Sequence, residues 1–304
     1  MTDRRETPRP ARRTSKPKPQ GEKPPKDWSD GERIAKWLAR AGVASRRACE
    51  TMIENGEIAV NGRKLTSPAF KVTGSETITV KGKRVSAPEA TRLWRYHKPS
   101  GLITTTNDPA GRRTIFDEMP KHLPRVVTVG RLDLTTEGLL LLTNDGELAR
   151  ALELPSNEFP RIYRARAHGK VTPEKLQALA DGIEVDGVRY APIKAELERE
   201  TGTNNWIRVE LSEGKKREVR RALESVGLDV NRLIRVAYGP FTLDDLHPGA
   251  VEEVLASELK AKLGSMIKPS SARPSRGARK PKPPRPDVET GLHKPQRNRT
   301  IRKK

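Results

Sequence analysis

The stretch Val129-Gly-Arg-Leu-Asp-Leu-Thr-Thr-Glu-Gly-Leu-Leu-Leu-Leu-Thr-Asn-Asp-Gly146 joins a polar loop to a run of four leucines. Residues 139–143 predict a buried strand, and the loop before it would hold the Asp133 carboxylate rigidly at the edge of that strand. Arg131 lies two residues away, and a neighbouring cation favours the ionised form of a carboxylate. An ionised, fixed carboxylate suits nucleophilic or general-base catalysis. Taken alone, an Arg-x-Asp pair is more often a loop salt bridge.

The sequence around this stretch alternates β-rich segments with helical ones. The pattern predicts strands at residues 139–143, 161–168, 193–197, 206–211 and 233–237. Helices are predicted at residues 146–152, 173–180, 217–225 and 249–263. Thr172 followed by Pro173 is a good cap and first-turn pair for one of them. We therefore expect an α+β domain with a mainly antiparallel sheet, preceded by a smaller module.

That smaller module, residues 27–88, reads as two helices followed by short strands. Ile34, Leu38 and Ala41 would share one face of a first helix that ends near Gly42. Ser45 can cap a second helix, residues 46–54, with an inward face made of Ala48, Met52 and Ile53. Short strands follow at residues 58–60 and 78–80, ending in the turn dipeptides Asn61-Gly62 and Lys81-Gly82.

Basic side chains gather on the two predicted helices: Arg33, Lys36, Arg40, Arg46 and Arg47. Such a face suits structured RNA, although a solvated helix face carries the same charges. The order Val43-Ala-Ser-Arg-Arg-Ala-Cys49, then Ile53-Glu-Asn-Gly-Glu-Ile-Ala-Val-Asn-Gly62, resembles the S4 RNA-binding domain. The resemblance implies RNA binding and does not specify a reaction.

The composition also indicates a polyanionic partner. Among 304 residues, 60 Lys+Arg and 39 Asp+Glu leave a net charge of +21, which favours nucleic acid over a membrane surface. The single Cys49 excludes a disulfide framework and a CxxC metal site. We expect a cytoplasmic protein, because no apolar run approaches the ~20 residues of a membrane span and the N-terminus is too polar for a secretory signal.

The excess charge is concentrated at the two ends of the chain. Residues 1–26 carry 9 basic and 3 acidic residues, and residues 265–304 carry 13 and 2, so the ends hold +6 and +11 of the +21. They also hold 13 of the 25 prolines. We expect both to be disordered tails that bind RNA phosphates weakly, flanking the module at residues 27–88 and a catalytic domain at residues 89–264.

The larger domain resembles a known enzyme family in several ordered motifs. Gly130-Arg-Leu-Asp133 followed by Thr136-Glu-Gly-Leu-Leu-Leu-Leu-Thr-Asn-Asp-Gly146 is similar to the catalytic motif of the RsuA/RluB-type pseudouridine synthases. Lys98-Pro-Ser-Gly-Leu-Ile103 matches the family's opening strand and turn, and the S4-like module precedes the domain as it does in the family. Glu213-Gly-Lys-Lys-Arg-Glu-Val-Arg-Arg221 is closer to enzymes of the large ribosomal subunit than to the small-subunit type, which usually carries a His-Gln-Val-Lys version.

The resemblance implies that the chain isomerises a uridine of ribosomal RNA to pseudouridine. The reaction breaks the bond between uracil N1 and ribose C1′ and rejoins the base through C5, so no cofactor or metal is required. Asp133 would be the essential carboxylate, and two roles fit: attack on C1′, or removal of the C2′ proton. The uridine must leave its stack to reach it.

The resemblance also assigns further residues. Tyr163 corresponds to the family's active-site tyrosine and would stack on the uracil, although an ordinary core aromatic of a strand is the alternative. Arg220 corresponds to the basic partner of the aspartate, and Leu233 to an apolar position of the uracil pocket that is as easily a plain core residue. Arg131 would help hold the RNA open or brace Asp133. The remaining cations of this motif would contact RNA phosphates: Lys215, Lys216, Arg217 and Arg221.

Other functions are compatible with parts of this pattern. The same chemistry on small-subunit rRNA or transfer RNA is one alternative, and an inactive ribosome-assembly factor that only binds RNA is another. Retention of Asp133, Tyr163 and Arg220 argues against the inactive factor. A DNA-binding regulator is less favoured, because no helix-turn-helix or dimerisation pattern is present. We expect a monomer.

Overall fold

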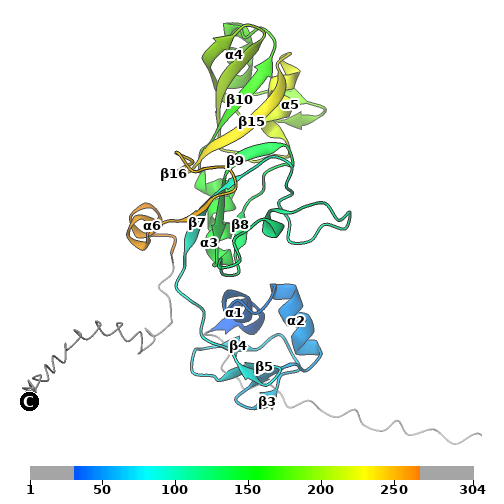
Figure 1. The fold of residues 1–304 in the computed structure, drawn as a ribbon, viewed down its shortest axis with the longest axis vertical. Coiled ribbons are helices and arrows are strands. Elements are labelled where there is room, and N and C mark those ends of the chain that lie inside the picture. Colours follow the sequence, from blue (N-terminus) through cyan, green and yellow to red (C-terminus); the bar gives the residue numbers. More distant parts are fainter. Residues whose placement is uncertain (1–30, 268–304) are drawn as a thin grey trace, which may run out of the picture.

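The computed structural model describes residues 31–267, and the predicted tails lie almost wholly outside this range. The amino-terminal module is a small α/β unit at one end of the molecule, drawn in blue and cyan in Figure 1. Its elements are β1 (Glu32–Arg33), α1 (Ile34–Arg40), α2 (Arg46–Glu54), β2 (Ile58–Val60), β3 (Arg63–Lys64), β4 (Lys71–Val72), β5 (Ile78–Val80) and β6 (Lys83–Arg84).

The two helices form where the sequence predicts them, but the buried face of α2 differs from the predicted one. The Ser45 hydroxyl accepts a 3.1 Å hydrogen bond from the backbone N–H of Ala48, which confirms the predicted cap of α2. The residues of α2 that are fully buried are Cys49 and Ile53, four apart on one face. Ala48 is exposed, so its predicted inward orientation is wrong: the helix presents the Cys49 stripe to the core instead.

The two turn dipeptides close β-hairpins. Asn61 and Gly62 have φ of 50° and 79° between β2 and β3, and Lys81 and Gly82 have φ of 50° and 78° between β5 and β6. Positive φ at both central residues suits two-residue hairpin turns, which is why Gly follows Asn or Lys here. These hairpins form a four-stranded sheet in the order β3-β2-β5-β6.

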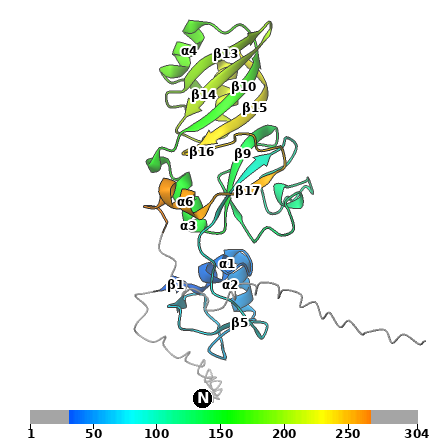
Figure 2. The same cartoon turned by 60° about the vertical axis from the view of Figure 1, so that its left-hand side comes forward.

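The larger unit is built on one long mixed sheet, most of which is visible in Figure 2. The order of its main path is β13-β14-β10-β15-β9-β7-β17, with β16 beside β15 and β8 beside β9. Its elements are β7 (Leu93–Lys98), η1 (Ile115–Asp117), β8 (Val127–Val129), β9 (Thr136–Thr143), α3 (Gly146–Glu153), η2 (Pro155–Asn157), β10 (Arg161–His168), α4 (Pro173–Ala180), β11 (Glu184–Val185), β12 (Val188–Arg189), β13 (Lys194–Thr201), β14 (Asn204–Leu211), α5 (Glu218–Ser225), β15 (Asp229–Tyr238), β16 (Phe241–Thr242), β17 (Val251–Glu253) and α6 (Ala256–Leu263).

The sheet is antiparallel except at one place. The strands β9 and β15 run parallel and share three residue pairs: Thr136 with Leu233, Glu137 with Ile234 and Gly138 with Arg235. This contact, which we call the seam, joins the strands β7, β8, β9 and β17 to the strands β10, β13, β14, β15 and β16. The predicted mainly antiparallel α+β architecture is therefore confirmed, and the parallel seam was not predicted.

The run of four leucines on β9 is buried on both faces of the sheet. Leu139 and Leu141 pack in a cluster with α3, which we call the α3 cluster. Leu140 and Leu142 pack in the β7–β9 cluster, whose buried members are Trp94, Tyr96, Leu102, Ile115, Val126, Leu132, Leu140 and Leu142. Burial on both faces explains why the sequence here is continuously apolar rather than alternating.

Most predicted elements are found, with a clear exception near the carboxyl end. The predictions for residues 161–168 and 173–180 coincide with β10 and α4, although Thr172 makes no side-chain capping bond. The single helix predicted for residues 249–263 is wrong. Residues 251–253 form β17 against the edge of β7, because Val251 pairs with Tyr96, and the helix α6 begins only at Ala256.

The two units meet through α1 and α3, which lie close together in both views (Figures 1 and 2). Lys36 of α1 forms an ion pair with Glu147 of α3, and Arg40 lies 3.9 Å from the carboxylate of Asp145, which caps α3. Glu32 joins both cations from within the module, at 3.1 Å and 3.2 Å. Across residues 31–267, no helix is both long and apolar enough to cross a membrane.

Candidate active site

The loop that carries Asp133 is anchored on its amino side by Thr104. The Thr104 hydroxyl donates a 2.8 Å hydrogen bond to the Leu132 carbonyl oxygen and lies 3.3 Å from the Leu132 N–H. The Leu132 side chain is buried in the β7–β9 cluster. The Thr136 N–H donates to the Asp133 carbonyl oxygen at 3.1 Å, which closes a turn at the start of β9. Asp133 itself is half-buried, so its carboxylate stands on a backbone fixed at both sides.

On the carboxyl side of Asp133 the loop is held by a buried cation. The side chain of Lys98, at the end of β7, is fully buried. Its ammonium donates to three carbonyl oxygens, those of Thr136 and Pro99 at 2.9 Å and that of Leu134 at 3.3 Å. Burial lowers the pKa of Lys98 to about 8, while the charges of Asp133 and Glu137 act in the opposite direction. Lys98 therefore places a positive charge behind the Asp133 loop.

Arg220 reaches the same loop from the other side of the seam. Its buried guanidinium donates through Nη1 to the Val230 carbonyl oxygen at 2.7 Å and through Nη2 to the Thr135 carbonyl oxygen at 3.4 Å. Within residues 31–267 its Nε is buried without a hydrogen-bond partner. Burial lowers the pKa of Arg220, and so does the charge of Arg217, while Asp133 opposes the shift. Arg220 is thus close enough to Asp133 to sense its charge.

The expected direct pairing of Arg220 with Asp133 is not formed. Within residues 31–267 no ion pair joins the two side chains, because the guanidinium is committed to backbone carbonyls. Arg131 does not brace Asp133 either: its side chain is exposed, and the described part of the chain contains no ion pair between them. Arg220 is thus buried next to the Asp133 loop, whereas Arg131 faces solvent.

Tyr163 and Leu233 complete the site from β10 and β15. The half-buried Tyr163 packs against both the β7–β9 cluster, which contains Leu132, and a second cluster that we call the α5 cluster. The buried members of the α5 cluster are Ala165, Ala167, Leu179, Ile193, Ile207, Val209, Leu211, Val219, Ala222, Leu223, Leu228, Val230 and Leu233. Leu233 is buried in it and pairs with Thr136 across the seam. Both predicted residues therefore lie beside the Asp133 loop.

The predicted phosphate-binding cations after β14 divide into two kinds. Lys215 is occupied by Glu213 and the Arg189 carbonyl oxygen, and Arg221 by Asp186 and the Tyr190 hydroxyl. Lys216 and Arg217 are exposed and form no ion pair within the described residues. The helix begins at Glu218 rather than at the predicted Arg217, which has a left-handed φ of 53°.

The basic residues of the amino-terminal module divide in the same way. Arg33, Arg46 and Arg47 are exposed and lie outside every ion pair of residues 31–267. Lys36 and Arg40 instead pair with acidic residues of the module itself and of the larger unit. The sequence alone gave no indication of the pairs with the larger unit, since Glu147 and Asp145 lie more than 100 positions away from Lys36 and Arg40.

Lys98 is the residue that the sequence analysis did not single out. It belongs to a family motif, and its ammonium donates hydrogen bonds to two carbonyl oxygens of the Asp133 loop. A signal was present: Lys98 continues the alternating face of Trp94 and Tyr96 along the strand, and a lysine on such an apolar face must be paired if it is buried.

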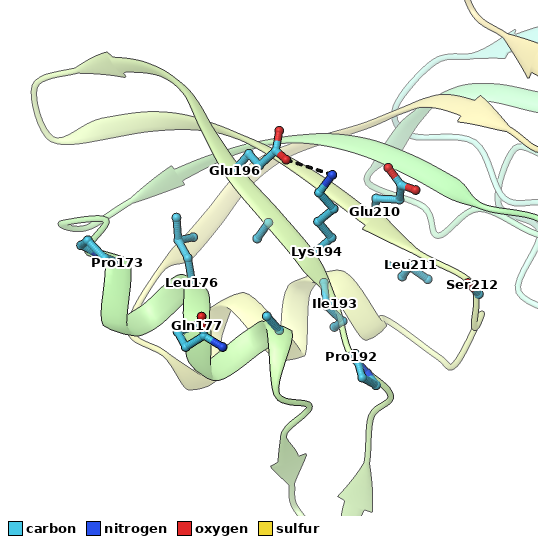
Figure 3. A pocket seen from close by; sticks show the side chains of 12 residues that line it. Pro173, Leu176, Gln177, Pro192, Ile193, Lys194, Glu196, Glu210, Leu211 and Ser212 are labelled. Carbon is cyan, nitrogen blue, oxygen red and sulfur yellow. Dashed lines mark ion pairs between the residues drawn. The ribbon is translucent and has the colours of Figure 1, made fainter.

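One surface groove lies away from the Asp133 loop. A groove of about 530 Å³ runs between α4 and the strands β13 and β14 (Figure 3). Its walls are mostly apolar, with the Lys194–Glu196 ion pair at one side. None of its lining residues belongs to the Asp133 site, and α4 lies at the end of the molecule far from the amino-terminal module (Figure 1). The groove therefore adds nothing to the site. Within residues 31–267, no group of three or more His, Cys, Asp or Glu side chains is placed to hold a metal ion.

Comparison with known proteins identifies the family of each of the two units. Residues 92–225 match the family model described as RNA pseudouridylate synthase, and residues 32–78 match the S4 domain. A protein of Rickettsia felis named "Uncharacterized RNA pseudouridine synthase" is 47% identical over 223 residues, which cover 73% of this chain and 96% of that protein. Ribosomal large subunit pseudouridine synthase B of Yersinia pestis is 42% identical over 219 residues, covering 70% and 69%.

A solved structure supports the fold. The crystal structure of a pseudouridylate synthase superimposes with a TM-score of 0.54 at 24% identity, covering 75% of this chain and 98% of that one. Together with the family models and the relatives, this similarity extends over both described units. The chain belongs to the RNA pseudouridine synthase family, in its RsuA/RluB-type branch with an S4 domain, and is an isomerase that acts on RNA.

Proposed function

We propose that this enzyme converts a uridine of large-subunit ribosomal RNA to pseudouridine and that Asp133 is its essential carboxylate. One observation carries the assignment of Asp133: the backbone around this residue is fixed by two buried cations. Lys98 donates to the carbonyl oxygens of Leu134 and Thr136, and Arg220 donates to that of Thr135. A carboxylate whose position is fixed in advance is what an enzyme needs for attack or proton abstraction.

The neighbours of Asp133 suit a flipped uridine. Tyr163 presents a half-buried ring beside the loop, and stacking on an aromatic ring recovers about 1–3 kcal/mol of the cost of unstacking a base. Leu233 supplies an apolar wall, and the exposed Arg131 can occupy the space that the flipped nucleotide leaves. The carboxylate then attacks C1′, or removes the C2′ proton, as the N1–C1′ bond breaks. The freed uracil turns and C5 bonds to C1′, which releases the carboxylate or lets the proton return to C2′; C5 then loses its proton and N1 gains one. The product has the same atomic composition as uridine, so the reaction is an isomerisation.

The proposal of large-subunit rRNA as substrate rests on sequence similarity. The matches named large subunit pseudouridine synthase B reach 42% identity in Yersinia pestis and 43% in Salmonella typhi. The motif 213–221 is of the same type. The exposed arginines of the S4 domain, Arg33, Arg46 and Arg47, together with Lys216 and Arg217, would contact RNA phosphates. We propose that the enzyme works as a monomer.

The test is pseudouridine mapping on unmodified large-subunit rRNA transcribed in vitro, with wild-type protein and with Asp133→Asn. Asparagine keeps the shape of the side chain and removes its charge. We expect one new pseudouridine with the wild type and none with the variant, while RNA binding is retained. Activity of Asp133→Asn would exclude Asp133 as the essential group. A site found only in small-subunit rRNA or transfer RNA would overturn the proposed substrate, and binding without any product would favour an RNA-binding assembly factor.

A further inference from the structure

The geometry of the active site depends on the seam between β9 and β15. Asp133 enters the site from the β9 side, whereas Tyr163, Arg220 and Leu233 come from strands and a helix on the other side. Three parallel residue pairs are the whole strand contact between these two halves of the sheet in residues 31–267. A small slide of β9 along β15 would therefore change the position of Asp133 relative to Tyr163, Arg220 and Leu233.

One side-chain pair bridges this seam beside the site. Glu137 follows Thr136 at the start of β9, and Arg232 directly precedes Leu233 on β15. The Arg232 guanidinium donates through Nε and Nη2 to the two carboxylate oxygens of Glu137, at 3.1 Å and 2.9 Å. A two-pronged contact of this kind fixes direction as well as distance, because both hydrogen bonds are lost when either strand slides.

The pair lies on the face of the sheet opposite to the proposed uracil pocket. Leu233 is buried in the α5 cluster, whereas the next residue, Ile234, packs against the α3 cluster. Side chains alternate between the two faces along a strand, so Arg232 shares the face of Ile234 and not that of Leu233. Glu137 alternates in the same way with Thr136. The pair therefore lies behind the proposed uracil pocket and not in its lining.

We propose that Glu137 and Arg232 are positioning residues that hold the Asp133 loop in register with the wall formed by Leu233 and Tyr163. This inference rests on the active site proposed above. The Arg232 side chain is 50% exposed and that of Glu137 17%, so the pair adds little to overall stability. The pair affects the rate of pseudouridine formation instead, because a displacement of about 1 Å at a reacting group can lower a rate about 100-fold.

The experiment is a double-mutant cycle with Glu137→Gln, Arg232→Gln and the double variant, together with the charge-exchanged double variant Glu137→Arg/Arg232→Glu. Single-turnover pseudouridine formation is measured on unmodified large-subunit rRNA transcribed in vitro, over a range of protein concentrations. Each single variant should lower the maximal rate about tenfold and leave the half-saturating protein concentration within about twofold. The double variant should be no slower than either single variant, and the charge exchange should recover most of the rate.

A matched control pair is Arg92 and Glu253, which form a similar two-pronged contact near the β17 edge of the sheet, away from the seam. Arg92→Gln and Glu253→Gln should leave the rate unchanged. The proposal is overturned if the losses of the two seam variants simply add. It is also overturned if Arg232→Gln weakens RNA binding while Glu137→Gln strengthens it, since Arg232 would then be a phosphate contact. Seam variants at the wild-type rate with an inactive Asp133→Asn would sink the positioning role alone; an active Asp133→Asn would sink the proposed active site.

Discussion

The Lys98 ammonium lies 2.9 Å from the Thr136 carbonyl oxygen and 3.3 Å from that of Leu134, so a single buried cation holds two of the three carbonyls that follow Asp133 in the loop. The third bond goes to the Pro99 carbonyl oxygen at 2.9 Å. Three acceptors require three N–H donors, and only the protonated lysine has them. The orientation of the Asp133 loop is thus tied to the charge of Lys98.

Lys98→Met should lower the maximal rate of pseudouridine formation about 100-fold, because the Asp133 loop loses its hydrogen bonds from Lys98 although methionine fills the same space. Single-turnover kinetics at saturating RNA would measure the loss. The control variant Lys194→Met removes an exposed lysine from an edge strand and should leave the maximal rate unchanged. A Lys98→Met enzyme as fast as the wild type would show that the anchor has no part in catalysis.

The same residue predicts opposite pH dependences for activity and for stability. Because burial lowers the pKa of Lys98 from 10.5 to about 8, the folded protein loses this proton as the pH rises through about 8, and the rate should fall there. Between about pH 8 and 10.5 the unfolded chain binds more protons, so the contribution of Lys98 to the free energy of unfolding rises by about 3 kcal/mol. Urea denaturation and kinetics at matched pH would separate the two. Lys98→Met should lack both transitions, and a rate that falls only together with stability would contradict this account.

Glu218 should lower stability at neutral and alkaline pH. It is buried at the start of α5, and one of its carboxylate oxygens finds no hydrogen-bond partner among the described residues. Burial raises its pKa to about 7, and the charge of Glu213 adds to the shift. Between about pH 4.5 and 7 the folded protein binds more protons than the unfolded chain, so stability falls as the pH rises through this window. Glu218→Gln should therefore raise the free energy of unfolding by about 1–3 kcal/mol at pH 8 and by little at pH 5. An equal change at both pH values would contradict the assignment.

Gly138 should tolerate no side chain. It has φ of +100°, and a Cβ there would lie 2.3 Å from the Arg235 carbonyl oxygen and 2.7 Å from the Arg235 nitrogen, at the last residue pair of the seam. We expect Gly138→Ala to lower the free energy of unfolding by about 3 kcal/mol or more, measured by urea denaturation. Gly202→Ala is the matched control: φ is +69° and the position is open, so the cost should be about 1–2 kcal/mol. Equal losses in the two variants would mean that the close approach of β9 and β15 does not limit stability.

The S4 domain should bind RNA through α2 more than through α1. Arg46→Ala together with Arg47→Ala should reduce the salt dependence of RNA binding by about two phosphate contacts. Lys36→Ala together with Arg40→Ala should affect RNA binding less, because these cations pair with Glu147 and Asp145. That pair of changes should instead release the S4 domain, seen as a larger radius of gyration in low-salt X-ray scattering. Equal losses of RNA affinity would show that Lys36 and Arg40 exchange their acidic partners for phosphates.

Local sequence was sufficient for the elements whose pattern is complete within a few residues. The strand β10, the helix α4 and the Ser45 cap were predicted correctly, since their signals are periodicity, a first-turn proline and a hydroxyl before a helix. The two hairpin turns followed in the same way from Asn61-Gly62 and Lys81-Gly82. The family motif at Asp133 and the order of the two units were also identified from the sequence.

Tertiary contacts decided what local pattern does not encode. Residues 251–253 became a strand because the edge of β7 was available, and Lys36 and Arg40 became part of a domain contact because α3 faces α1. Lys98 and Arg220 bind backbone carbonyls of the Asp133 loop from 36 and 85 positions away. The sequence by itself therefore determined most of the elements and the motif that contains Asp133. Only the folded structure decided which charges are buried against the backbone of that loop, because pairing and desolvation depend on neighbours that are distant in the sequence.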